Sequence, residues 1–207
     1  MKESARGAVL EGADPGAIAE APNPAGKIHY ARSLPLAKAL DGALLALAMN
    51  GEPLTPSHGF PLRAIVPGWF GMAAVKWLQR IIVIEQPYNG YYQTVDYAFW
   101  QRDDSGPRLV PITQMQVKAS IARPGINEVI AAGSSYKITG AAWTAEAEIA
   151  KVEVSTDGGK SWSEASLGQE RALNCWQLWE WNWQTPAKPG RCILIARATH
   201  SRGPTRP

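Results

Sequence analysis

The chain has 207 residues, of which 45% are apolar and 19% charged, with a formal net charge of +3. This length suits one large domain or two small ones, and the apolar share is sufficient for a packed core. The charge is too small and too dispersed to indicate nucleic-acid binding, although it suits a small anionic ligand. No apolar run approaches the roughly 18 residues of a membrane-spanning helix, so we expect no membrane partner.

The remaining global features are weak signals. Residues 1–16 contain neither an apolar h-region nor an Arg-Arg pair, so we expect no export signal within this chain. Cys175 and Cys192 form no zinc-binding pattern. We expect two small buried side chains there, with a disulfide as the alternative.

The first half of the chain predicts mixed structure. Residues 1–30, rich in Ala, Gly and Pro, predict an irregular segment with one short strand at Ala8–Glu11. The leucine spacing over Leu34–Met49 predicts two short helices, or a helix and a turn. Strands are predicted at Leu62–Val66 and at Val75–Glu85, which is rich in β-branched residues.

The character of the sequence changes near residues 107–114. The polar segment Gln101–Pro111 predicts a linker, and short strands recur regularly after it. Such spacing is typical of an all-β sandwich, with Asp157-Gly158-Gly159 forming a tight hairpin. The fold class is therefore α+β, with domains at 1–110 and 111–207. The expected sandwich strands are Met115–Ile121, Tyr136–Trp143, Ile149–Ser155, Ser161–Ala165, Trp176–Trp183 and Cys192–Thr199.

Three basic side chains are candidates for an anion site. His58 follows a turn, Arg63 enters a predicted strand, and Lys76 begins the next strand. Arginine offers a bidentate fork and lysine a point charge, which together suit a phosphate. The alternative is that all three are solvated charges at strand ends, with His58 as a capping residue.

Other candidates have ordinary structural alternatives. Tyr97 is either a hydrogen-bond donor to an anionic substrate or a core aromatic residue. Asp14 by itself indicates a turn. The period of two places Trp179, Trp181 and Trp183 on one strand face, which indicates a sandwich core or, alternatively, a sugar-stacking platform.

Several segments carry a family resemblance. In chain order they are SLPL, MNGEPL, HGFPLR, VPGWFG and VKWL, then GYYQTVDYAFW, and finally SYKITGAAW and VEVSTDGGKSW. Over about residues 8–200 they resemble the sulfite oxidase family of molybdenum enzymes. The resemblance implies the C-terminal part of a molybdopterin-binding domain, followed by an immunoglobulin-like dimerisation domain truncated at its C-terminus.

The resemblance also implies roles for particular residues. The HGFPLR histidine and arginine hold the molybdopterin phosphate, and the segment at VKW contacts the same cofactor. An aspartate of the EG-x-D segment touches the pterin, and the tyrosine of the DY motif lies at the substrate pocket. The implied cofactor-binding residues are Asp14, His58, Arg63, Ala74, Val75 and Lys76, and the implied catalytic residue is Tyr97.

The activity implied for a complete protein is oxidation of sulfite, or a related sulfur oxyanion, to sulfate by oxygen-atom transfer. Its cofactor is molybdenum-molybdopterin, its electron acceptor a protein such as a cytochrome c, and its expected state a homodimer, often periplasmic. The cysteine that ligates molybdenum belongs to an earlier segment absent here, and Cys175 and Cys192 do not replace it. We therefore expect an incomplete, inactive fragment. The alternatives are a nitrate reductase of the same family and a non-catalytic dimerisation module.

Overall fold

The computed structural model describes residues 3–19, 24–145 and 147–203, which form two compact units, Met1–Gln114 and Met115–Pro207. Within the described ranges, no helix is both long and apolar enough to cross a bilayer.

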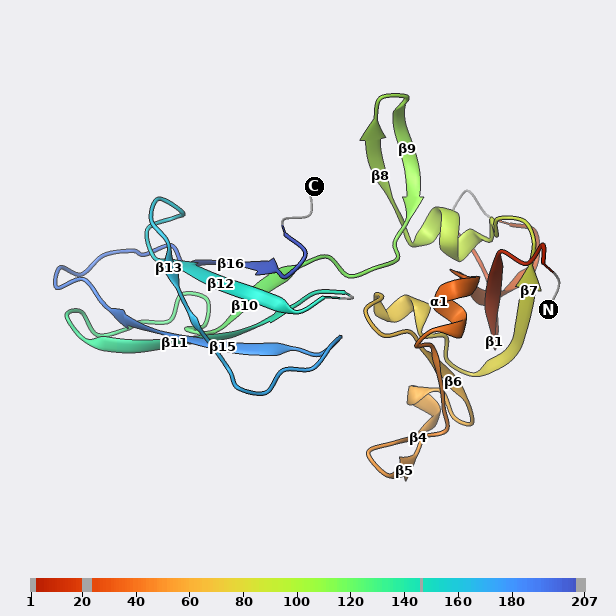
Figure 1. The fold of residues 1–207 in the computed structure, drawn as a ribbon, viewed down its shortest axis with the longest axis horizontal. Coiled ribbons are helices and arrows are strands. Elements are labelled where there is room, and N and C mark those ends of the chain that lie inside the picture. Colours follow the sequence, from red (N-terminus) through yellow and green to blue (C-terminus); the bar gives the residue numbers. More distant parts are fainter. Residues whose placement is uncertain (1–2, 20–23, 146, 204–207) are drawn as a thin grey trace. The chain divides into compact units, whose positions relative to one another are not determined.

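The first unit is built on a three-stranded antiparallel sheet in the order β2-β1-β7, with three small β-pairs and four short helices around it (Figure 1). The sheet strands are β1 (Gly7–Ala17), β2 (Lys27–Pro35) and β7 (Leu78–Ile84). The small pairs are β3 (Leu44–Ala46) with β6 (Arg63–Ile65), β4 (Ala48–Met49) with β5 (Glu52–Pro53), and β8 (Ala98–Asp103) with β9 (Gly106–Pro111). The helices are α1 (Leu36–Leu40), the 3₁₀ turns η1 (Pro56–His58) and η2 (Gly71–Ala73), and the π-helix η3 (Tyr92–Asp96).

The core of the first unit lies where β1 and β2 meet the segments after β6. Leu10 and Leu34 pack there with Val66, Val75 and Leu78, all of them buried. The central strand β1 is buried over most of Gly7–Gly12 because it has a neighbouring strand on each side. This core fixes the loops before and after β6 relative to the sheet.

Two predictions for the first unit are wrong. The short strand expected at Ala8–Glu11 is part of the longer β1, and β1 and β2 pair along most of their length around a register shift between Glu11 and Pro15, where an irregular segment was expected. The segment Gln101–Pro111 is not a linker, since β8 and β9 pair as a hairpin closed by Gly106 at φ 111°. Long-range or local backbone pairing overrides a turn-rich composition in both places.

The leucine-rich segment follows the second of its two predicted arrangements, a helix and a turn. It contains one helix of five residues, α1, and the chain then turns at Gly42, with φ of 91°, into β3. Leu40, Leu44 and Leu47 are 66%, 57% and 65% exposed, so they do not form a buried helical face.

The second unit is a sandwich of two antiparallel sheets, visible as two layers in Figure 1. One sheet has the order β10-β11-β15-β14, and the other the order β13-β12-β16. The strands are β10 (Lys118–Arg123), β11 (Ser135–Trp143), β12 (Ile149–Ser155), β13 (Ser163–Glu164), β14 (Ser166–Leu167), β15 (Gln177–Gln184) and β16 (Ile195–His200). The α+β prediction, with a sandwich as the second part, is confirmed.

The tryptophan-rich strand β15 supplies the sandwich core. Trp179 and Trp183 are 2% and 7% exposed, and they pack with Ile138, Val152 and other core residues. Trp181 packs partly buried against the same cluster, which leaves this face no room to serve as a sugar platform. Trp176 is 63% exposed and lies before β15, where it stacks on Trp143 with ring centroids 4.4 Å apart.

Two local features of the sandwich complete the fold. Asp157 accepts hydrogen bonds from the Ser161 hydroxyl, the backbone of Lys160 and the Ser155 hydroxyl, which together hold its pKa well below its usual range. These bonds organise the predicted turn at Gly158 and Gly159, both with positive φ. Both cysteines are free, and the expectation that Cys175 is buried is wrong because its side chain is exposed.

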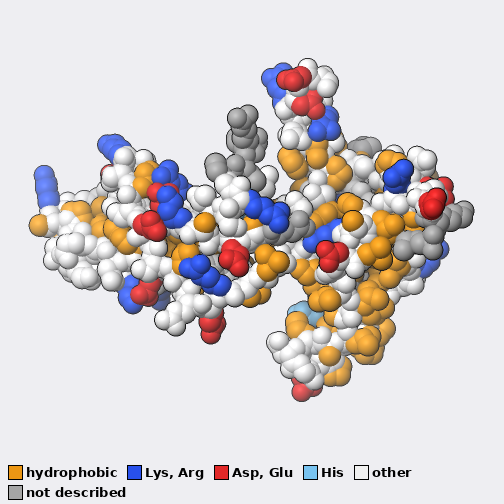
Figure 2. Space-filling model, viewed as in Figure 1, with side chains coloured by type: hydrophobic (Ala, Val, Ile, Leu, Met, Phe, Trp, Pro, Cys, Tyr) orange, Lys and Arg blue, Asp and Glu red, His pale blue; other side chains and the backbone are white. Residues whose placement is uncertain are grey.

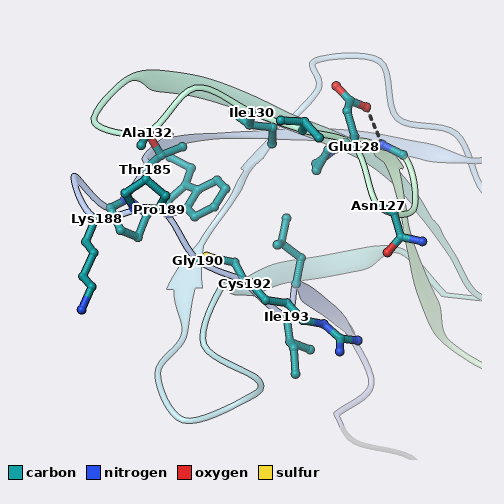
Figure 3. Close-up of a pocket in the computed structure, with 17 residues that line it drawn as sticks. Asn127, Glu128, Ile130, Ala132, Thr185, Lys188, Pro189, Gly190, Cys192 and Ile193 are labelled. Atoms are coloured by element: carbon teal, nitrogen blue, oxygen red, sulfur yellow. Dashed lines mark hydrogen bonds between the residues drawn. The ribbon is translucent and has the colours of Figure 1, made fainter.

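A cleft of about 580 Å³ lies at one end of the sandwich, between the loop after β10 and the loop before β16 (Figure 3). Its walls are mainly apolar, from Ile130, Trp183 and Ile193. On its rim the Glu128 carboxylate accepts a hydrogen bond of 2.7 Å from the Gly125 amide. The residues implied as cofactor ligands lie in the first unit instead.

Candidate functional site

The candidate site begins at the loop that contains His58 and Gly59. Pro56 opens the turn η1, and the Thr55 hydroxyl lies 2.7 Å from Nδ1 of His58, which fixes the imidazole against its own loop. Gly59 ends the turn with φ of 101°, a conformation that favours glycine. A Cβ at Gly59 would lie 2.9 Å from the Lys76 Cβ and 3.1 Å from the Arg63 Cβ. The loop therefore passes between Arg63 and Lys76 at a distance that only glycine permits.

Both basic side chains bind the backbone of this loop. Arg63 donates from Nη1 to the carbonyl of His58 (3.1 Å) and from Nη2 to that of Ala74 (3.4 Å). Lys76 donates from Nζ to the carbonyl of Ser57 (3.0 Å), and its ammonium lies 4.7 Å from the centre of the Trp77 ring. The structure thus brings the Arg63 and Lys76 side chains, from β6 and the segment before β7, to the loop that carries His58.

This arrangement fits an anionic group such as a phosphate. The Arg63 guanidinium and the Lys76 ammonium meet at one loop, and an ammonium that donates one hydrogen bond to a carbonyl keeps two further N–H donors. Within the described part of the chain, the buried Arg63 Nε has no hydrogen-bond partner. Phosphate oxygens are strong acceptors for such charge-assisted bonds.

The other residues predicted around the phosphate take different positions. The Ala74 carbonyl is at the site, since it accepts from Arg63. Val75 is 1% exposed in the core, and its amide and carbonyl pair with Ala73 and Ala64, so it supports the site from beneath. Asp14 is exposed on β1, next to Ala13, whose amide donates to the carbonyl of Trp77 (2.8 Å).

Tyr97 lies in a second cluster of the first unit, with aromatic residues and an arginine. Its ring makes an edge contact with Tyr30 at 6.2 Å, and the guanidinium of Arg32 lies 5.8 Å from its centre. Tyr30 also contacts Tyr92 at 4.9 Å and donates its hydroxyl to the carbonyl of Met72 (2.7 Å). Burial raises the pKa of Tyr30 well above its usual range, so its phenol stays neutral and a donor.

Asp14 is linked electrostatically to this aromatic cluster. Burial is the largest cause of the raised pKa of Tyr92, and the Asp14 carboxylate adds to it. The same carboxylate contributes to the raised pKa of Tyr30. Asp14 therefore lies near the aromatic cluster while its neighbour Ala13 is bonded to the segment of Lys76 and Trp77.

Three residues at these clusters were not predicted from the sequence. Trp77 adopts φ of 49° and donates Nε1 to the carbonyl of Pro56 (2.9 Å), and Ser57 supplies the carbonyl that binds Lys76. Arg32 is 1% exposed on β2. Its signal in the sequence was an arginine inside the strand-like segment HYARSLPL, where a charge is unexpected.

Comparison with known proteins defines the class. Residues 1–92 match the family model of the oxidoreductase molybdopterin binding domain, and residues 110–207 match that of the Mo-co oxidoreductase dimerisation domain. The cation cluster at His58 thus lies in a molybdopterin-binding domain, and the sandwich is a dimerisation domain. The chain belongs to the sulfite oxidase family, and both the family and its molybdopterin cofactor are as predicted.

Relatives in this family differ in the reaction they are named for. The chain is 35% identical over 182 residues to mitochondrial sulfite oxidase of Mus musculus, covering 82% of this chain and 33% of that protein. It is 36% identical over 161 residues to the NADPH nitrate reductase of Aspergillus niger, covering 67% of this chain and 18% of that protein. The crystal structure of the sulfane dehydrogenase SoxCD from Paracoccus pantotrophus superposes with a TM-score of 0.82 at 28% identity, over 100% of this chain and 49% of that chain. The chain spans only a third of the length of its sulfite oxidase relatives.

Proposed function

We propose that the protein oxidises sulfite, or a related sulfur oxyanion, to sulfate. The observation that carries this proposal is the convergence of Arg63 and Lys76 on the His58–Gly59 loop, where the buried Nε of Arg63 has no hydrogen-bond partner among the described residues. Such a site suits the phosphate of the molybdopterin that this family binds. The 35% identity to mammalian sulfite oxidases supports the choice of substrate.

The residues of this chain would bind and orient the reacting groups. Arg63, Lys76 and His58 would hold the cofactor phosphate, and Asp14 would contact the pterin. When bound, the molybdenum cofactor supplies the oxygen-atom transfer and takes up two electrons. Tyr97 would donate a hydrogen bond to an oxygen of the anionic substrate, in surroundings made positive by Arg32.

The test uses the protein purified at its native length. We expect extractable pterin, about one molybdenum per chain, and sulfite-dependent reduction of cytochrome c or ferricyanide. Protein that holds neither pterin nor molybdenum would contradict the proposal and favour a dimerisation module without catalytic function. A protein that holds both but reduces nitrate with an artificial donor, and ignores sulfite, would identify the second candidate, a nitrate reductase, which the similarity to the fungal enzyme favours.

We also propose that the sandwich forms a homodimer, that a cytochrome c accepts the electrons, and that the protein is periplasmic. The match of residues 110–207 to a dimerisation domain supports the first of these. The other two rest on the family resemblance and are predictions.

We further propose that this chain alone is catalytically incomplete. Large apolar side chains of the first unit lie exposed, among them Leu44, Leu45, Ile81 and Val83 at 50–57%. Figure 2 shows such side chains gathered over this unit. Exposed apolar surface of this kind is typical of a face that another segment covers.

The isolated chain is therefore expected to unfold in two steps. The first unit should lose its circular dichroism at a lower temperature than the sandwich, because part of its apolar surface is in contact with water. The measurement is thermal unfolding followed by far-ultraviolet circular dichroism, with tryptophan fluorescence as a second probe that six sandwich and three first-unit tryptophans contribute to. One cooperative transition for both units would contradict the proposal.

A further inference from the structure

Arg32 is a buried cation for which the described residues provide no ion pair. Its side chain comes from β2 and is 1% exposed. The groups that interact with its charge are the phenols of Tyr30, Tyr97 and Tyr88, and burial is the largest cause of its lowered pKa. Burying a charge without a carboxylate partner costs folding free energy, so we looked for a function of Arg32 at this position.

The hydrogen bonds of Arg32 close a ring around the backbone of Tyr97. Arg32 Nη1 donates to the carbonyl of Tyr92, and Nη2 donates to that of Ile112, each at 2.6 Å. The Tyr92 carbonyl also accepts from the amide of Tyr97 (3.3 Å). The amide of Ile112 donates to the carbonyl of Tyr97 (2.9 Å). One guanidinium therefore holds both backbone partners of Tyr97.

A second clamp attaches the same π-helix to β2. The side-chain amide of Gln93 accepts from the backbone of Ser33 and donates to its hydroxyl, each at 2.7 Å. Arg32 and Ser33 are adjacent, so consecutive residues of β2 anchor η3. A π-helix is uncommon and often marks a functional position.

We propose that Arg32 is a positioning residue for Tyr97, holding its backbone through two carbonyls and keeping a fixed positive charge beside its ring. The proposal rests on the proposed function only where it assigns Tyr97 to the substrate. A fixed donor geometry matters there because a misplaced hydrogen-bond donor loses much of its effect on a developing charge.

The test replaces Arg32 and follows amide hydrogen exchange in the full chain. Arg32→Gln is expected to raise exchange at Tyr97 and Ile112 at least tenfold, while exchange in the paired region of β1 and β7 stays unchanged. Arg32→Lys, which keeps the charge but donates from one atom, should show a smaller increase. If Arg32→Gln does not fold, the Arg32→Lys variant takes its place in the exchange measurement. The control Arg108→Gln removes an exposed arginine of β9 that pairs with Asp103, and it should change neither amide.

Unchanged exchange, or an equal increase throughout the first unit, would overturn the positioning role. In protein that turns over sulfite, the double variant Arg32→Gln with Tyr97→Phe should be no slower than Tyr97→Phe alone. The reason is that Arg32 acts only by positioning the Tyr97 hydroxyl, which Tyr97→Phe has already removed. Additive losses in kcat would overturn the claim that Arg32 acts through Tyr97. If the wild-type protein does not oxidise sulfite, the proposed function fails, and the exchange measurements still decide the positioning role.

Discussion

Arg63→Gln is expected to weaken retention of the molybdopterin cofactor by about 10- to 100-fold. A hydrogen bond to a charged group contributes about 1.5–3 kcal/mol, and each 1.4 kcal/mol is a tenfold change in affinity. The buried Nε of Arg63 has no partner in the described part of the chain, so the phosphate would gain a desolvated, charge-assisted contact there. The variant should keep its fold, because the hydrogen bonds it loses are to two loop carbonyls.

The measurement is pterin and molybdenum content per chain after dialysis of the protein at its native length. Lys76→Gln should show a smaller loss, since lysine offers a point charge rather than a fork. The matched control is Arg80→Gln, which removes an arginine of β7 paired with Glu11 outside the loop. Full cofactor content in both Arg63→Gln and Lys76→Gln would contradict the phosphate site.

Gly140→Val is expected to destabilise the sandwich by about 3 kcal/mol or more. Gly140 is paired with Trp179 across β11 and β15, and a Cβ added there would collide with the Trp179 ring and with the carbonyl oxygen of Ser120. Overpacking a core costs about 1–3 kcal/mol when neighbours can shift. Here one neighbour is backbone of a paired strand, so the cost lies at or above that range.

Thermal unfolding of the chain checks this prediction. For a domain of this size, each 1 kcal/mol lowers the melting temperature by roughly 4–8 °C. Ala141→Val is the matched control, because Ala141 is the next residue of β11 and points to the opposite, half-buried face. A sandwich melting temperature for Gly140→Val within 2 °C of the wild type, with the Ala141→Val control also unchanged, would contradict the prediction. It would mean that the neighbouring strands shift to admit the valine at a cost of about 0.5 kcal/mol at most.

Local patterns predicted the sandwich better than the first unit. The prediction is correct almost to the residue for the strands Tyr136–Trp143 and Ile149–Ser155, because the alternation of buried and exposed positions along a strand requires an alternation of apolar and polar residues in its sequence. In contrast, the polar composition of Gln101–Pro111 predicts a linker where the structure has the hairpin of β8 and β9. Their pairing buries little apolar surface, so it left no periodic signal.

At the candidate site, too, the sequence predicted some features and only the structure showed others. His58, Arg63 and Lys76 were named from charge type and motif, and the structure brings them to one loop. Their convergence depends on the positive φ of Gly59 and on the packing of the loop against the segment before β7. Trp77 binds the carbonyl of Pro56 and Ser57 supplies its own carbonyl to Lys76, and such backbone contacts leave no signature in the sequence. For Arg32 the sequence showed a charge in an unexpected place, but not the carbonyls that it binds.

The sequence by itself determined the α+β class, the two-part organisation, the family, and the basic residues suited to an anion. These features follow from residue chemistry and short-range periodicity, which do not depend on the final packing. Only the tertiary structure decided that Arg32 is buried against Tyr97 and that Leu40, Leu44 and Leu47 remain exposed. The physical reason is that burial and hydrogen bonding depend on which distant segments meet, a property of the folded chain as a whole.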